Sequence, residues 1–205
     1  MAAITQMVPD VAVNVPDCPE VVIEKYLRQS AIDFCRRTYA WRSVETETLS
    51  SSELPYDVPA PAGGRVFGVL SVMAGGVALD TSGVRDLDIA VSDWRTVTGV
   101  PEMFVEESRG LVTVIPLPST SMDFIITAAY EPTATATTIP DELYRDYHDA
   151  IVSGVIMRLS MTARWLNANL VVAHRALYED GVSRALVSLH GNHTLRGMNT
   201  TISPI

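Results

Sequence analysis

The sequence predicts a mixed α+β protein in which a three-helix bundle carries an inserted module, a small antiparallel β-sandwich or β-barrel. Apolar residues recur at three- and four-residue steps within residues 17–42 and 139–190, whereas short β-branched runs between turn residues fill residues 43–138. The chain has 205 residues, of which 47% are hydrophobic and 19% charged. It is therefore long and apolar enough to bury a substantial core.

Residues 1–16 are expected to form an extended N-terminal arm, because Pro9 and Pro16 interrupt a stretch without helical periodicity. No basic-then-apolar leader occurs here, and no apolar run is long enough to span a bilayer. The sequence therefore predicts a soluble protein that is made in the cytosol. Cys18 and Cys35 are too far apart along one helix to form a disulfide, so reduced cysteines are expected.

Residues 17–42 are predicted to form an amphipathic helix, with Asp17 placed to cap its start. The residues of its apolar face follow one another at helical spacing: Ile23, Leu27, Ala31, Phe34 and Trp41. Such a face needs a partner of similar length. Because Phe34, Tyr39 and Trp41 give the helix an aromatic C-terminal end, we expect them to form the junction between the bundle and the β module.

Residues 43–138 show the short strands and turns of an antiparallel β module. The clearest signals are a strand at 44–49, a hairpin over 66–79 with a turn at Gly75-Gly76, a hairpin over 103–117 with a turn at 108–110, and a strand at 122–130. Residues 132–138 are expected to be a linker. The module holds thirteen acidic residues against four arginines, which argues against tight, phosphate-neutralising DNA binding.

Two further helices are predicted beyond the module, at residues 139–161 and 168–190, separated by a short break in which Asn167 is placed as a cap. So short a break allows only an antiparallel helix hairpin. This hairpin supplies the partner that the first helix needs. Residues 191–205 contain glycine and scattered apolar residues, and they are expected to form a second extended arm.

The sequence contains no catalytic, cofactor-binding or metal-binding motif. No phosphate-binding P-loop, G-x-G-x-x-G, H-E-x-x-H or G-x-S-x-G occurs, and residues 43–138 lack histidine. A metal at His190 and His193 lacks a nearby carboxylate or thiol, and an acidic cluster at Asp86, Asp88 and Asp93 lacks the glycine and glutamate of an EF-hand loop. Solvated side chains are expected at both places, and the protein is expected not to be an enzyme.

Three segments together resemble the head-to-tail adaptor (connector) proteins of tailed bacteriophages, especially the tail tubular protein A kind. They are AIDFCRRTYAWR at 31–42, DWRTVTGVPEMFVEESRGLVTVIPLP at 93–118 and TIPDELYRDYHDAIVSGVIMRLSM at 138–161. Each motif alone is degenerate, and their order carries the resemblance. Helix, β module and helix hairpin together account for nearly all of residues 18–190.

The resemblance implies a structural virion protein of the neck, assembled in the bacterial host cytoplasm. Such proteins form a homo-oligomeric ring, typically dodecameric, beneath the portal protein, contact the tail nozzle or tube protein, and let double-stranded DNA pass without sequence-specific binding. The resemblance also implies that the terminal arm embraces the portal or a neighbouring subunit. The arm residues that would make this contact are Leu195, Arg196, Met198, Ile202 and Ile205.

Two alternatives remain open from the sequence. The first is a head-completion or stopper protein in the neck of a long-tailed phage, which has the same general role with other partners. The second is a carbohydrate-binding β module, for which Tyr56 and Trp94 are the best surface aromatic residues.

Overall fold

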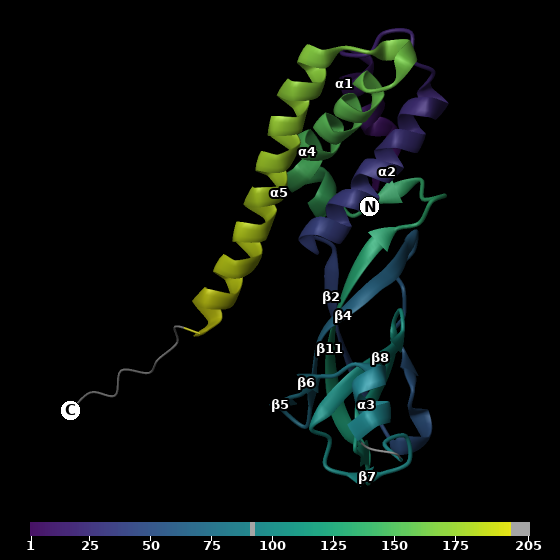
Figure 1. Cartoon of the computed structure of the whole chain (residues 1–205), viewed down its shortest axis with the longest axis vertical. Helices are drawn as coiled ribbons and strands as arrows, with labels where there is room; N and C mark the ends of the chain where they lie inside the picture. The colour runs from purple at the N-terminus through teal and green to yellow at the C-terminus, as the bar shows by residue number, and fades with distance from the viewer. Residues whose placement is uncertain (91–92, 198–205) are drawn as a thin grey trace, which may run out of the picture. The chain divides into compact units, whose positions relative to one another are not determined.

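A computed structural model describes the backbone of residues 1–90 and 93–197 and the side chains of residues 1–89 and 93–188. The chain divides into two compact units. The helical unit comprises residues 1–40 and 132–205, and the β unit comprises residues 41–131. The fold class is mixed α+β, as predicted (Figure 1). No helix in the described part of the chain is long and apolar enough to cross a membrane.

The helical unit is built around helices that come from both ends of the chain. Its described elements, in chain order, are β1 (Ala2–Ala3), η1 (Ile4–Met7), α1 (Val8–Ala12), α2 (Glu20–Thr38), β12 (Thr138–Ile139), α4 (Asp141–Ser160), η3 (Ala163–Trp165) and α5 (Ala168–Gly197). The helices α4 and α5 pack closely against each other, and α2 packs against both (Figure 1). The short helix α1 packs against α2 and α4.

The helix α2 is shorter at both ends than the predicted helix over 17–42. It begins after Pro19, which occupies the N-cap position without a side-chain cap, so the cap predicted at Asp17 is wrong. It ends because Tyr39 adopts a left-handed conformation with φ of 51°, in which its N–H donates to the Cys35 carbonyl at 2.8 Å. Glycine is the usual residue in this conformation. Because a tyrosine occupies the position here, the sequence carries no glycine to signal this helix end.

The N-terminal segment is not the extended arm that the sequence suggested. Its strand β1 pairs with β12, and η1 and α1 bury the apolar residues Ile4, Met7, Val8, Val11 and Val15. Pro9 lies in the first turn of α1, where a missing N–H costs little, so it does not break the helix. The spacing of these buried residues follows the helical period, which makes the segment part of the core.

Residues 132–138, expected as a linker, are also part of the helical unit. Ala136 is buried, and its carbonyl accepts a hydrogen bond from Arg28 Nε at 2.9 Å. The carbonyl of Thr137 accepts one from the Ile4 N–H at 3.0 Å. The β unit therefore ends at residue 131 and not at 138.

The turn between α4 and α5 has the predicted form. The side-chain oxygen of Asn167 accepts hydrogen bonds from the N–H groups of Asn169 and Leu170, both at 3.2 Å, which confirms it as a cap. Beyond this turn α5 continues to Gly197, so it includes residues 191–197 that were assigned to an arm. Gly191 costs a helix only about 1 kcal/mol, too little to end it when other residues favour the helix.

The β unit contains two four-stranded sheets, with strand orders β2-β11-β4-β5 and β3-β9-β8-β6. Its described elements are β2 (Arg42–Leu49), η2 (Ser51–Glu53), β3 (Tyr56–Asp57), β4 (Gly64–Ala74), β5 (Val77–Ala78), β6 (Asp80–Thr81), α3 (Val84–Ala90), β7 (Thr98–Gly99), β8 (Met103–Ser108), β9 (Leu111–Ile115), β10 (Leu117–Pro118) and β11 (Met122–Pro132).

Most strand pairs in the β unit are antiparallel, and both predicted hairpins form. The strands β4 and β5 meet across Gly75-Gly76, and β8 and β9 meet across Gly110 with a bulge between Glu106 and Ser108. The prediction of a purely antiparallel module is wrong for β6 with β8 and for β7 with β10, which pair in parallel. These pairs join segments that are distant in sequence, so no turn motif announces them.

Candidate interaction site

Helix α4 lies at the centre of the helical unit because two glycines allow its neighbours to approach closely. A Cβ atom at Gly154 would overlap the Ser30 hydroxyl of α2 and would lie 2.9 Å from the Tyr178 ring of α5. A Cβ atom at Gly181 of α5 would overlap the Ala150 side chain of α4. In the space at Gly154, the Ser30 hydroxyl donates to the Ile151 carbonyl at 2.8 Å.

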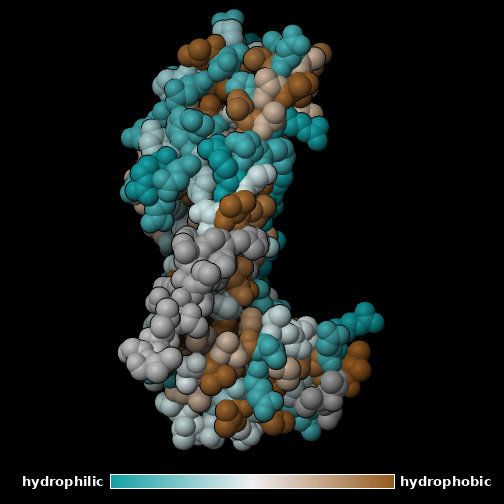
Figure 2. Space-filling view, turned by 90° about the vertical axis from the view of Figure 1, so that its left-hand side faces the viewer, coloured by the Kyte–Doolittle hydropathy of each residue, from teal (hydrophilic) through white to brown (hydrophobic). Residues whose placement is uncertain are grey.

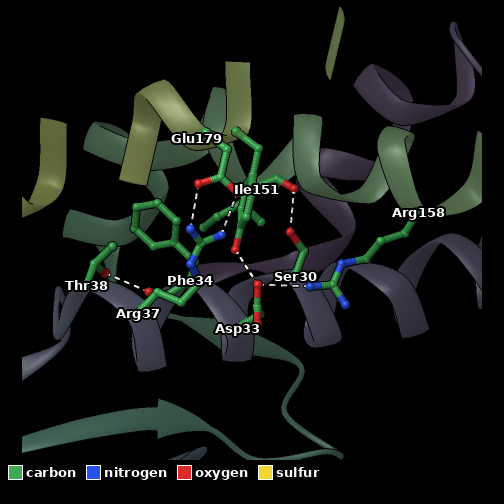
Figure 3. Close-up of polar contacts among 9 residues, drawn as sticks. Ser30, Asp33, Phe34, Arg37, Thr38, Ile151, Arg158 and Glu179 are labelled. Carbon is green, nitrogen blue, oxygen red and sulfur yellow. Dashed lines mark hydrogen bonds and ion pairs between the residues drawn. The ribbon is translucent and has the colours of Figure 1, made fainter. Parts of the chain in front are cut away.

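A polar network fixes α2 against α4 and α5 (Figure 3). The Asp33 carboxylate on α2 accepts a hydrogen bond from the Tyr178 hydroxyl at 2.7 Å and pairs with Arg158 of α4 at 3.0 Å. Arg37 donates two hydrogen bonds to Glu179 of α5, the first at 2.9 Å and the second at 2.5 Å. Such bidentate pairs fix geometry as well as adding energy.

The pKa shifts of this network follow from the same contacts. Burial, followed by the hydrogen bond to Asp33, raises the pKa of the Tyr178 hydroxyl well above its ordinary range. The hydrogen bond from Arg37 lowers the pKa of Glu179, and the same bond raises the pKa of Arg37. At neutral pH, Tyr178 is therefore a neutral donor and Arg37–Glu179 is an ion pair, so the network has a structural role.

Phe34 lies beneath this network, where it is fully buried. Its ring centroid lies 5.0 Å from that of Tyr147 on α4 and 6.2 Å from that of Tyr178 on α5. Three helices thus meet at one aromatic cluster, consisting of Phe34, Tyr147 and Tyr178. Together, the network and the cluster hold α2, α4 and α5 as the frame on which the surface of the helical unit is built.

A groove of about 380 Å³ opens on this frame between α1, α4 and α5. Val152 and Ile156 of α4 and Leu177 of α5 give it an apolar lining. The carboxylates of Asp10 and Asp149 lie on opposite sides of the His148 ring, 3.1 Å from Nε2 and from Nδ1 respectively. The groove therefore combines an apolar floor with an acidic rim, which suits a cationic and apolar partner.

His174 of α5 also lines the groove, and it gives the helical unit a dependence on pH. Burial lowers the pKa of His174 below its ordinary value of 6.5, so the folded chain binds this proton less readily than the unfolded chain. The unfolded chain takes up the proton as the pH falls below about 6.5, which shifts the equilibrium toward unfolding. The contribution of the neutral His174 side chain to the free energy of unfolding is therefore fully present above about pH 6.5 and is lost as the pH falls below it.

We expect the melting temperature of the wild type to fall between about pH 7 and pH 5 more steeply than that of His174→Gln. Differential scanning calorimetry across this range measures the two slopes. Glu179, whose pKa is also lowered, titrates at more acidic pH and does not obscure the comparison. Parallel slopes for the two proteins would contradict this account of His174.

The structure separates the residues that the sequence grouped at the helix end. Phe34 packs inside the helical unit, and Tyr39 forms the end of α2. Trp41 packs inside the β unit, with its ring centroid 6.0 Å from that of Tyr130. The division between the units falls between residues 40 and 41, immediately after this helix end.

The other sequence-predicted positions have mixed outcomes. Leu195 and Arg196 belong to α5, but their side chains are outside the described part of the structure. Met198, Ile202 and Ile205 lie outside the described residues altogether. The sequence did not predict the residues that line the groove. Asp10 and His148 are 138 positions apart, and no local pattern signals that they meet.

The residues considered for chemistry in the β unit have structural partners. Trp94 is 1% exposed, so it is not the surface aromatic that a carbohydrate site would need. Its indole N–H donates to Asp88 at 2.8 Å, and the Arg95 guanidinium lies over its ring at 4.0 Å. The hydrogen bonds from Trp94 and Arg95 lower the pKa of Asp88. Among the described residues, no group of three His, Cys, Asp or Glu side chains could hold a metal ion.

Comparison with known proteins identifies the chain by family. A search of curated proteins finds no match. The family model described as SU10 adaptor protein matches residues 2–201, which include both units. A match over nearly the whole chain cannot arise from one shared motif, and it agrees with the resemblance seen in three separate segments. The chain therefore belongs to the SU10 adaptor protein family.

Proposed function

We propose that the chain is a structural virion protein that joins the phage head to the tail. In this proposal it oligomerises into a dodecameric ring beneath the portal, contacts the tail nozzle or tube protein, and forms part of the DNA channel. The observation that carries the proposal is the match to an adaptor family over residues 2–201. The match includes both units, so the family relationship applies to the whole architecture.

The chemistry of the described residues supports a structural role without catalysis. Among the titratable groups with shifted pKa values in the helical unit, Tyr178, Glu179 and Arg37 are partners in packing contacts between helices. The buried Glu131 of the β unit pairs with Arg65 at 2.6 Å. None of these groups forms a nucleophile–base pair that faces a pocket. We propose, accordingly, that the protein is not an enzyme.

The charge distribution is compatible with a channel through which DNA moves. The chain as a whole carries a formal net charge of −9 at pH 7. A wall rich in phosphate-pairing cations would hold DNA by releasing its counterions, whereas an acidic surface would not. We propose that the helical unit forms the ring body, with the three-helix arrangement of α2, α4 and α5 as its centre. The β unit then supplies outer or tail-side contacts, and the C-terminal residues contact the portal.

Mixing the purified protein with the portal protein of the same phage tests this function. We expect dodecameric rings on the portal, visible by negative-stain electron microscopy and countable by native mass spectrometry. The protein alone is expected to be monomeric or weakly associated. A stable monomer that does not bind the portal would contradict the adaptor function.

A chain that ends after residue 190 separates docking from folding in the same assay. It lacks Leu195, Arg196, Met198, Ile202 and Ile205 but keeps the described contacts of α5 with α4. Because the core contacts remain, we expect an unchanged far-UV spectrum per residue and a weakened portal interaction. If the shortened chain binds the portal as strongly as the full chain, the C-terminal residues do not contribute to the portal contact.

A further inference from the structure

The helix α2 presents a basic and apolar face to solvent, opposite its buried face. Val21, Lys25, Gln29, Ile32 and Arg36 follow one another at four- and three-residue steps, so they lie along one line of the helix. Val21 is 77% exposed, Lys25, Gln29 and Arg36 are exposed, and Ile32 is partly exposed. This line, called here the α2 face, contains two cations and no acid.

The groove between α1, α4 and α5 has the opposite character. The side chain of Asp149 on its rim is 98% exposed, and that of Asp10 is 54% exposed. The exposed residues of α4 that precede Asp149 include further acids at Asp141, Glu142 and Asp146, with Arg145 as the one base, itself paired with Asp146 at 2.8 Å. Arg184 of α5 also lines the groove, where it pairs with Asp180 at 3.0 Å. The groove and its surroundings therefore carry more acids than bases around an apolar floor of Val152, Ile156 and Leu177.

We propose that the α2 face of one copy docks into the acidic groove of a second copy of this chain. Lys25 would lie against the carboxylates of the rim, and the apolar side chains of the α2 face would cover the floor of the groove. A helix laid into an apolar groove is a recurring mode of recognition, and opposite charges fix its register. The charge complementarity between two faces of the same helical unit makes a second copy the occupant.

The proposed contact joins two different faces, so it is heterologous. A heterologous contact leaves one free groove and one free α2 face at the two ends of every row of copies. Further copies can therefore add until the row closes into a ring, and without closure the row becomes a filament. The inference rests on the proposed function, because it names the contact between neighbouring copies in the ring. It identifies the two surfaces that meet, the α2 face of one copy and the groove of the next copy.

Two charge-altered proteins test the contact. The α2 variant carries Lys25→Glu and Gln29→Glu, and the groove variant carries Asp10→Lys and Asp149→Lys. In low salt, where surface charges are least screened, each variant should self-associate at least about tenfold more weakly than the wild type. Sedimentation velocity over a concentration series measures this change. The matched control is Arg85→Glu with Ser71→Glu, which makes the same charge change as the α2 variant at exposed positions of the β unit and should associate like the wild type.

Mixing the two variants gives the decisive result. The groove variant keeps a normal α2 face and the α2 variant keeps a normal groove, and the two reversed surfaces are again opposite in charge. Both contacts can therefore form between alternating copies, so we expect the mixture to regain association, as should a chain carrying all four substitutions. Circular dichroism spectra like that of the wild type show that the variants fold.

The inference is overturned if the variants associate as the wild type does, or if their mixture stays monomeric under conditions in which the wild type associates. It is also overturned if the mixed variants do not associate with each other and each variant also fails to bind the portal. In that case the α2 face and the groove contact the portal and not a second copy. Rings of normal size formed on the portal by both variants would refute this contact alone and leave the adaptor function standing. Absence of rings from the wild type with portal would refute the function itself.

Discussion

Replacing Phe34 with alanine is expected to lower the free energy of unfolding of the helical unit by about 3–5 kcal/mol. Phe34 is 0% exposed, and its ring contacts Tyr147 and Tyr178, so its removal leaves a cavity where α2, α4 and α5 meet. Aromatic pairs add about 0.5–1.5 kcal/mol beyond the area they bury. A loss of this size is a large part of the about 5–15 kcal/mol that stabilises a typical domain.

Hydrogen exchange measured by mass spectrometry locates the effect of Phe34→Ala. Peptides from α2, α4 and α5 should lose protection, while peptides from β8 and β9 in the β unit keep theirs. Val21→Ala is the matched control, because it removes an exposed apolar side chain from the same helix and should change stability by less than about 0.5 kcal/mol. Equal losses of protection in both units would contradict the division of the core at residues 40 and 41.

Local periodicity was sufficient to predict the long helices and the hairpins. The apolar spacing at Ile23, Leu27 and Phe34 places these residues on the buried face of α2, and the acids Asp141 and Glu142 in the first turn of α4 mark its start. The turns at Gly75-Gly76 and Gly110 have positive φ, which only glycine adopts without strain, so the sequence shows both hairpins. These features depend on interactions between residues that are close in the chain.

The errors arose where long-range contacts override local signals. Prolines at positions 9 and 16 suggested an arm, yet pairing of β1 with β12 and burial of Met7 and Val11 hold that segment in the core. The left-handed Tyr39 ended α2 without a glycine to announce it. The groove was also unpredictable, because Asp10, His148 and His174 come from three helices, α1, α4 and α5, and no local pattern signals that they meet.

The largest effect expected in the β unit is that of Trp41→Ala, a loss of about 3–5 kcal/mol in the free energy of unfolding. Trp41 is 8% exposed, and its ring packs against Tyr130 and over Gly64. The Tyr130 N–H donates to the Trp41 carbonyl at 2.8 Å, a backbone bond that alanine keeps. The loss therefore reports on the ring alone, and hydrogen exchange should locate it in β4 and β11 while α4 and α5 stay protected.

Gly64→Ala provides the stricter test of this packing, because a Cβ atom there would overlap the Trp41 ring. In the wild type, Gly64→Ala should destabilise the β unit by about 1–3 kcal/mol, the usual cost of overpacking. In the Trp41→Ala background the same methyl group enters the space left by the ring, so it should cost little or restore stability. The double-mutant cycle then gives a coupling energy of at least about 1 kcal/mol, measurable by urea unfolding. If Gly64→Ala costs the same in both backgrounds, the ring does not lie over Gly64 in solution.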